Sequence, residues 1–232
     1  ALLDEAGVDL TGVSPVEDPT GTALILVGGT GENMIVVVPG ANGTVTDAQA
    51  RTAVEAMSGG DILMLQLEIP GTAVEAALAA SRARGVTTIL NTAPLTDQAA
   101  RLAALADIVI ANEREFELLA GRSDLEPAAR EEALLALHGE TGQTFIITLG
   151  ADGVIAARDG ALHRAKGLKI EPVDTVGAGD TFCGYLAAAL DSGIAFDQAL
   201  RRAAVAGSLA CLKPGAQPSI PTRDEVEGRL QG

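Results

Sequence analysis

The stretch "DTVGAGDTF", Asp174 to Phe182, places three small residues and a carboxylate directly before "CGYLAAAL", a run that predicts a helix. The first N–H groups of a helix have no intrahelical partner, and the helix dipole adds partial positive charge there. Small side chains leave this backbone open to an approaching anion. Gly177, Ala178 and Gly179 are therefore predicted to form an anion hole.

Asp180 lies in the first turn of the same predicted helix. An isolated aspartate at such a position is most simply a favourable charge for the helix dipole. Beside an anion hole, it is also placed to accept the proton of a hydroxyl group that attacks the anion. Together the two features indicate phosphoryl transfer to an alcohol, with Asp180 as the base.

The order of the elements predicts an α/β fold with a mostly parallel sheet flanked by helices on both faces. Short apolar strands alternate with helical segments from residue 47 onward, and uninterrupted apolar strands are typical of a parallel sheet. Strands are predicted at 61–66, 86–90, 107–111 and 144–150, and helices at 47–57, 72–85, 97–105, 113–121, 127–139, 177–193 and 196–212. A hairpin is predicted over 153–165, with Asp159-Gly160 at its turn.

An earlier pair of apolar runs predicts a separate small hairpin. "TALILVG" and "NMIVVVP" flank the link "GTGE". A phosphate-binding loop would open a helix at this point, whereas a second strand-like run follows, which favours a hairpin over residues 20–40. We expect one domain over residues 1–232, with this hairpin as a lid within it.

Composition excludes several classes of partner. The chain of 232 residues is 47% hydrophobic, enough for one sizeable core, and its net charge of −15 repels nucleic acid and anionic lipid. Its apolar runs are far shorter than the ~20 residues of a membrane span. With two cysteines and no basic leader, a cytoplasmic location is expected. None of the three lysines follows a glycine, so there is no GxxxxGK[ST] loop.

Polar residues follow the predicted strands in a series. They are Glu68, Asn91, Asn112, Thr148 and Asp174. Any one of them is equally typical of a helix cap or a turn. Ligands of open α/β sheets bind at the carboxyl ends of the strands, so the series indicates a ligand site at that edge.

Six stretches carry a resemblance to a known family: "DTVGAGDTF", "NTAP" (91–94), "NERE" (112–115), "TLGADG" (148–153), "GENMIVVVPGAN" (31–42) and "KPGAQPSIPT" (213–222). In these the chain resembles, nearly end to end, the ribokinase-like (PfkB) sugar kinases. The resemblance implies transfer of the γ-phosphoryl group of ATP, with Mg²⁺, to the terminal hydroxymethyl group of a sugar. The "PGAN" and "GAQPSIP" stretches favour D-ribose over fructose or adenosine.

The resemblance also implies roles for particular residues. Asp180 is the catalytic base and a sugar contact, and Glu68 is a second sugar contact. The anion hole is formed by Gly177, Ala178 and Gly179; the magnesium ion and phosphates are organised by Asn112 and Glu115; the nucleotide is contacted by Thr148, Gly150, Gly153 and Gly179. An activating K⁺ is surrounded, mostly through carbonyl oxygens, by Asp174, Val176, Ala210, Lys213, Gly215 and Ser219.

The sequence also departs from the family. Members carry upstream strands with an acidic sugar contact and a Gly-Gly-rich motif, and this sequence begins after both. We therefore expect impaired sugar turnover and association, as a homodimer, through an exposed sheet edge and the hairpin. The alternatives are a nucleotide-binding remnant without turnover, or a kinase for another sugar or nucleoside. Cys183 is interpreted as core packing rather than a nucleophile.

Overall fold

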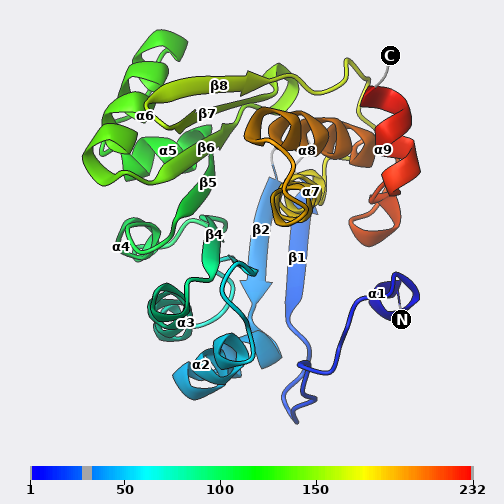
Figure 1. Ribbon diagram of the computed structural model, residues 1–232. Coiled ribbons are helices and arrows are strands. Elements are labelled where there is room, and N and C mark those ends of the chain that lie inside the picture. Colours follow the sequence, from blue (N-terminus) through cyan, green and yellow to red (C-terminus); the bar gives the residue numbers. More distant parts are fainter. Residues whose placement is uncertain (1, 28–32, 231–232) are drawn as a thin grey trace.

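The computed structural model describes residues 2–27 and 33–230. A six-stranded sheet has the strand order β3-β4-β5-β6-β7-β8, and helices lie on both of its faces (Figure 1). A two-stranded sheet, β1-β2, forms separately. The predicted α/β architecture is therefore confirmed.

The main sheet is parallel at one side and antiparallel at the other. The parallel strands are β3 (Ile62–Leu65), β4 (Thr87–Asn91), β5 (Ile108–Asn112) and β6 (Thr144–Thr148). The antiparallel strands are β7 (Val154–Arg158) and β8 (Ala161–Ala165). Asp159 and Gly160 have φ values of 51° and 75° at the turn between them, as a tight hairpin requires.

Two hydrophobic cores lie on opposite faces of this sheet. Successive strand residues point to opposite sides, so Leu90 and Val109 enter one core while Ile89 and Ile110 enter the other. This explains why the strands read as continuous apolar runs. The first core is covered by α2 (Asp47–Glu55), α3 (Gly71–Arg84), α4 (Ala99–Ala103), α5 (Glu113–Leu119) and α6 (Pro127–Thr141). The second is covered by α7 (Ala178–Asp191) and α8 (Phe196–Ala210).

Two helices were not expected from the sequence. The short α1 (Leu2–Glu5) lies near the N-terminus, and α9 (Arg223–Leu230) packs against α8 (Figure 1). Val226 is the buried residue of α9, and the hydroxyl of Tyr185 donates to the carbonyl of Pro221 just before it. The charged sequence of α9 has no apolar stripe, so periodicity does not reveal it.

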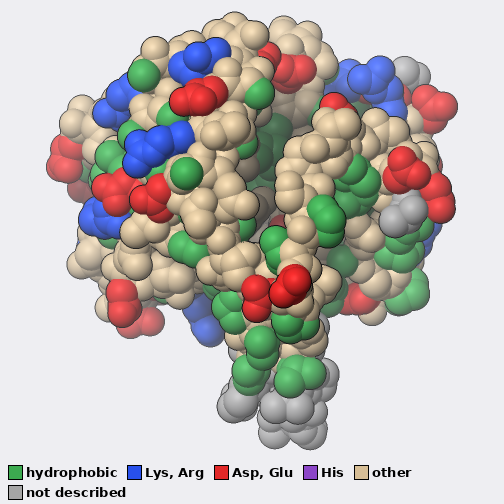
Figure 2. All heavy atoms as spheres, turned by 90° about the horizontal axis from the view of Figure 1, so that it is seen from below, with side chains coloured by type: hydrophobic (Ala, Val, Ile, Leu, Met, Phe, Trp, Pro, Cys, Tyr) green, Lys and Arg blue, Asp and Glu red, His purple; other side chains and the backbone are tan. Residues whose placement is uncertain are grey.

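The β1-β2 hairpin is present as predicted. Strands β1 (Thr22–Val27) and β2 (Asn33–Val38) pair antiparallel, with Leu24 opposite Val36. The link predicted as the turn, 28–32, lies outside the described residues. Leu24, Val36, Val37 and Val38 are exposed. In Figure 2, apolar side chains gather on a segment that projects from the molecule.

Across residues 2–27 and 33–230, no helix combines the length and apolar character required to cross a membrane.

Candidate active site

The carboxyl ends of the parallel strands bring several of the predicted site residues together. Asn91 ends β4, Asn112 ends β5 and Thr148 ends β6, and Asn112 is paired with Thr148 in the sheet register. Glu68 lies exposed in the segment after β3. Asp174 differs from the rest because it follows an irregular segment and ends no strand.

The N-terminus of α7 is open. Gly177 is its N-cap, with φ 76° and no side-chain capping hydrogen bond. The Ala178 N–H donates to Thr175 O at 3.3 Å, whereas the N–H groups of Gly179 and Asp180 donate to no acceptor within the described part of the chain. Two unpaired donors at a helix N-terminus are suited to binding an anion.

Gly177 is required in this turn by its backbone and by its neighbour. Its positive φ is costly for other residues, and a Cβ atom at this position would lie 3.1 Å from Ala216 Cα. Asp180 follows as the third residue of α7 and is exposed. The structure therefore places a carboxylate beside the open N-terminus, as the sequence predicts.

The pair formed by Asn112 and Glu115 is the capping box of α5. Asn112 Oδ1 accepts from the Glu115 N–H at 2.9 Å, and Glu115 Oε2 accepts from the Asn112 N–H at 2.9 Å. Asn112 Nδ2 also donates to Glu115 Oε1 at 2.8 Å. The cap interpretation of Asn112 is therefore correct. It does not exclude a ligand role, because Glu115 is only 7% exposed and forms no ion pair with the described residues.

Sequence analysis missed a third member of this network. The hydroxyl of Thr92, directly after β4, donates to Glu115 Oε2 at 3.2 Å, and Thr92 is 0% exposed. The available signal was its place in "NTAP", one residue after the strand end.

The thiol of Cys183 is buried on α7, about one turn after Asp180. Burial raises the pKa of Cys183 to about 12, and the negative charges of Asp180 and Glu115 contribute to the increase.

We expect Cys183 to resist alkylation in the folded protein. With a pKa of about 12, roughly one thiol in ten thousand is ionised at pH 8, and the thiolate is the reactive form. Iodoacetamide followed by mass spectrometry should leave Cys183 unmodified under native conditions and modify it in urea. Rapid native alkylation would contradict its assignment to core packing.

The donor set fits a magnesium ion that arrives with a nucleotide. Within the residues that the structure describes, no group of three or more His, Cys, Asp or Glu side chains could hold a metal ion. Mg²⁺ usually keeps several waters and is bound by one or two carboxylates together with substrate phosphates. Glu115, with Asn112 beside it, provides such a carboxylate.

The β6–β7 turn contains the three residues expected to contact the nucleotide. Thr148 and Gly150 lie at its entrance, where Gly150 is exposed. Gly153 is buried, and a Cβ atom on it would lie 2.3 Å from Ala165 O. Close packing against the end of β8 therefore explains why residue 153 is a glycine.

The segments expected to surround a monovalent cation are tied together by Asp174. Its Oδ2 accepts from the Gly215 N–H at 2.9 Å and its Oδ1 from the Val176 N–H at 3.0 Å. These hydrogen bonds, that of Gly215 first, lower the pKa of Asp174. Ser219, four residues after Gly215, is buried. The Lys213 side chain is exposed and forms an ion pair with Glu225.

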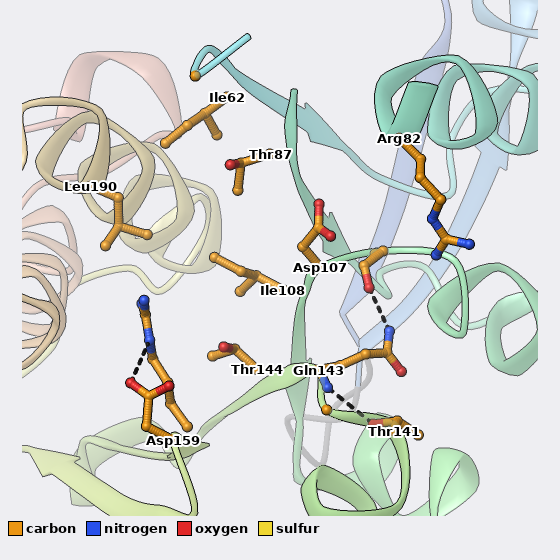
Figure 3. Close-up of a pocket in the computed structure, with 14 residues that line it drawn as sticks. Ile62, Arg82, Thr87, Asp107, Ile108, Thr141, Gln143, Thr144, Asp159 and Leu190 are labelled. Carbon is orange, nitrogen blue, oxygen red and sulfur yellow. Dashed lines mark hydrogen bonds and ion pairs between the residues drawn. The ribbon is translucent and has the colours of Figure 1, made fainter. Parts of the chain in front are cut away.

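A cleft of about 540 Å³ lies at the opposite, amino end of the parallel strands (Figure 3). Ile62 and Leu190 line one side of it, and Asp107 and Gln143 the other. Gln143 Nε2 donates to two backbone carbonyls and Asp107 Oδ2 accepts from Thr88, so these groups hold the strand starts in place. None of the predicted site residues lines this cleft.

An α/β sheet with an open helix N-terminus and a carboxylate beside it is suited to phosphoryl transfer. The sequence profile described as "pfkB family carbohydrate kinase" matches residues 1–223. The chain therefore belongs to the pfkB family of carbohydrate kinases, which confirms the resemblance noted from its motifs.

Several ribokinases are similar to this chain in sequence. The chain is 36% identical over 223 residues to the ribokinase of Haemophilus influenzae, covering 96% of this chain and 73% of that protein. It is 33% identical over 232 residues to that of Schizosaccharomyces pombe, covering 97% and 73%.

Solved structures of ribokinases are similar to this chain in fold. A ribokinase from Cryptococcus neoformans in complex with ADP superposes with a TM-score of 0.84 at 29% identity, covering 99% of this chain and 78% of that one. An Arabidopsis thaliana ribokinase complexed with ribose and ATP superposes with a TM-score of 0.80 at 30% identity, covering 93% and 70%.

Proposed function

We propose that the protein transfers the γ-phosphoryl group of ATP to the terminal hydroxymethyl group of D-ribose. The observation that carries this proposal is the open N-terminus of α7 with Asp180 in its first turn. Support for the acceptor comes from relatives named ribokinase and from a similar structure described with ribose and ATP.

In this proposal Asp180 orients the attacking hydroxyl group and accepts its proton as the new O–P bond forms. The N–H groups of Gly179 and Asp180 stabilise negative charge on the transferred group, and Gly177 and Ala178 leave the approach open. Phosphoryl transfer depends mainly on positioning and charge stabilisation, so these groups suffice as the catalytic set. Asn112 and Glu115 would hold a Mg²⁺ ion, which would neutralise part of the phosphate charge.

The remaining residues are assigned to binding. Thr148, Gly150 and Gly153 shape the nucleotide side of the site, and Glu68 joins Asp180 on the sugar. A K⁺ ion is proposed within the segments that Asp174 ties together, near Val176, Ala210, Lys213, Gly215 and Ser219.

Calorimetry and a coupled ADP assay test the proposal. We expect Mg²⁺-dependent binding of ADP, and ADP release stimulated by ribose more than by fructose or adenosine. A folded sample that binds no nucleotide would refute the kinase assignment. Stimulation by fructose or adenosine instead would refute ribose as the acceptor.

We further propose that the 232-residue chain turns ribose over slowly. Its assigned sugar contacts are Glu68 and Asp180, and both are exposed. A sugar hydrogen bond contributes ~0.5–1.5 kcal/mol to affinity, so two such contacts predict weak binding of ribose. The alternative function, nucleotide binding without turnover, would show the same ADP affinity and no response to ribose at any concentration.

We also propose that residues 1–232 form a single domain. Two copies of the chain are proposed to associate through the β1-β2 hairpin. Leu24 and Val36 are cross-strand partners on one face and Val37 lies on the other, and all three are exposed. A hairpin with bare apolar side chains on both faces favours a partner. Light scattering should give twice the chain mass, and Val36→Lys should shift the protein toward the monomer. A wild-type monomer at micromolar concentration would contradict the proposal.

A further inference from the structure

The Thr92 hydroxyl has two possible acceptors, and only one of them can take its proton. Thr92 Oγ1 lies 3.2 Å from Glu115 Oε2 and 3.2 Å from Ile110 O. The Ile110 carbonyl already accepts the Thr92 N–H at 2.9 Å. A carboxylate is also the stronger acceptor. The hydroxyl proton is therefore assigned to Glu115.

This assignment decides which oxygen of Glu115 stays open. A carboxylate offers about four lone-pair sites, two on each oxygen. Oε2 accepts from the Asn112 N–H and from Thr92, whereas Oε1 accepts only from Asn112 Nδ2. The remaining site is thus on Oε1. Without the Thr92 hydroxyl, a lone-pair site on Oε2 is unoccupied as well. The carboxylate is then held by two hydrogen bonds in place of three.

We propose that Thr92 is a positioning residue that orients Glu115 for the magnesium ion of the bound nucleotide. It acts from the position directly after β4, while Asn112 acts from the end of β5, so the carboxylate is held from the ends of two neighbouring strands. The inference rests on the proposed function, because it requires a Mg²⁺–nucleotide complex at Glu115. Groups that hydrogen-bond a metal-binding carboxylate fix its direction and thereby raise metal affinity.

The test measures the Mg²⁺ dependence of ADP binding by calorimetry. Thr92→Val keeps the shape of the side chain and removes the donor. We expect the Mg²⁺ concentration that gives half-maximal binding to rise about tenfold, with ADP affinity at saturating Mg²⁺ changed less than about twofold. Thr92→Ser, which restores the hydroxyl, should return the Mg²⁺ dependence to within about twofold of wild type. Thr92→Ala removes the donor with less bulk and serves where valine prevents folding.

Thr88 provides a matched control on β4, the strand that Thr92 directly follows. It is buried, and its hydroxyl donates to a carboxylate, Asp107 Oδ2, at 2.7 Å, but it lies at the amino end of β4. Thr88→Val should lower the melting temperature, as any lost buried hydrogen bond does, and leave the Mg²⁺ dependence unchanged.

Each result has a distinct meaning. An unchanged Mg²⁺ dependence in Thr92→Val and Thr92→Ala, with wild type binding Mg²⁺–ADP normally, overturns the inference and leaves the proposed function standing. An equal shift in Thr88→Val also overturns it, because the effect would then be general loosening of β4. A wild-type protein that binds no ADP at any Mg²⁺ concentration overturns the proposed function itself.

Discussion

Asp180→Asn is expected to reduce ribose-dependent ADP release by ~10²–10⁴, the usual contribution of a general base. Asparagine keeps the size of the side chain and cannot take the proton of the hydroxyl group. The open N–H groups at the start of α7 are unchanged, so ADP affinity should stay within a few-fold of wild type. A coupled assay and calorimetry on the same preparation measure the two quantities.

Asp191 offers a control on the same helix. It is exposed at the opposite end of α7, so Asp191→Asn alters the helix charge and leaves the proposed site untouched. If Asp180→Asn kept most of its turnover, Asp180 would serve only as a favourable charge for the helix dipole, and the assignment of the base would be wrong.

Gly153→Ala is expected to lower the free energy of unfolding by about 3 kcal/mol or more. The glycine has φ 93° and ψ −127°, a conformation restricted to glycine, and an added Cβ atom would lie 2.3 Å from Ala165 O. For a chain of this length, such a loss corresponds to a decrease of roughly 6–12 °C in melting temperature. Thermal unfolding followed by circular dichroism measures it.

Gly150→Ala is the matched variant in the same turn. Gly150 has φ 56°, and a Cβ atom there would meet no other atom within 4 Å, so only the backbone strain of about 1–2 kcal/mol applies. Equal melting temperatures for the two variants would show that β8 can move to accommodate a Cβ atom. Packing would then not require glycine at residue 153.

Local pattern was sufficient to predict most of the fold. The apolar runs that form β4, β5 and β6 are recognisable as strands because both faces of the sheet are buried. The pair Asp159-Gly160 is typical of a tight turn and predicted the β7–β8 hairpin. The open N-terminus of α7 was likewise predictable, since it depends on neighbouring residues in sequence.

Contacts between distant residues could not be predicted in this way. Thr92 and Glu115 meet only because β4 and β5 are neighbours in the sheet, and nothing local to either residue indicates that. The hydrogen bond from the Gly215 N–H to Asp174 spans 41 positions, so the residues around Asp174 give no indication of this partner. Helix α9 was missed because only Val226 of its residues is buried.

The contact of Gly177 with Ala216 has a consequence for biosynthesis. A ribosome adds about 5–20 residues per second, and N-terminal parts of a chain begin to fold first. Strands β3 to β6 can therefore assemble while the residues around 215, which brace the turn before α7, are still being made. A nascent chain would thus acquire these strands seconds before the proposed phosphate site at the start of α7, so we expect an unfinished polypeptide to consume no ATP.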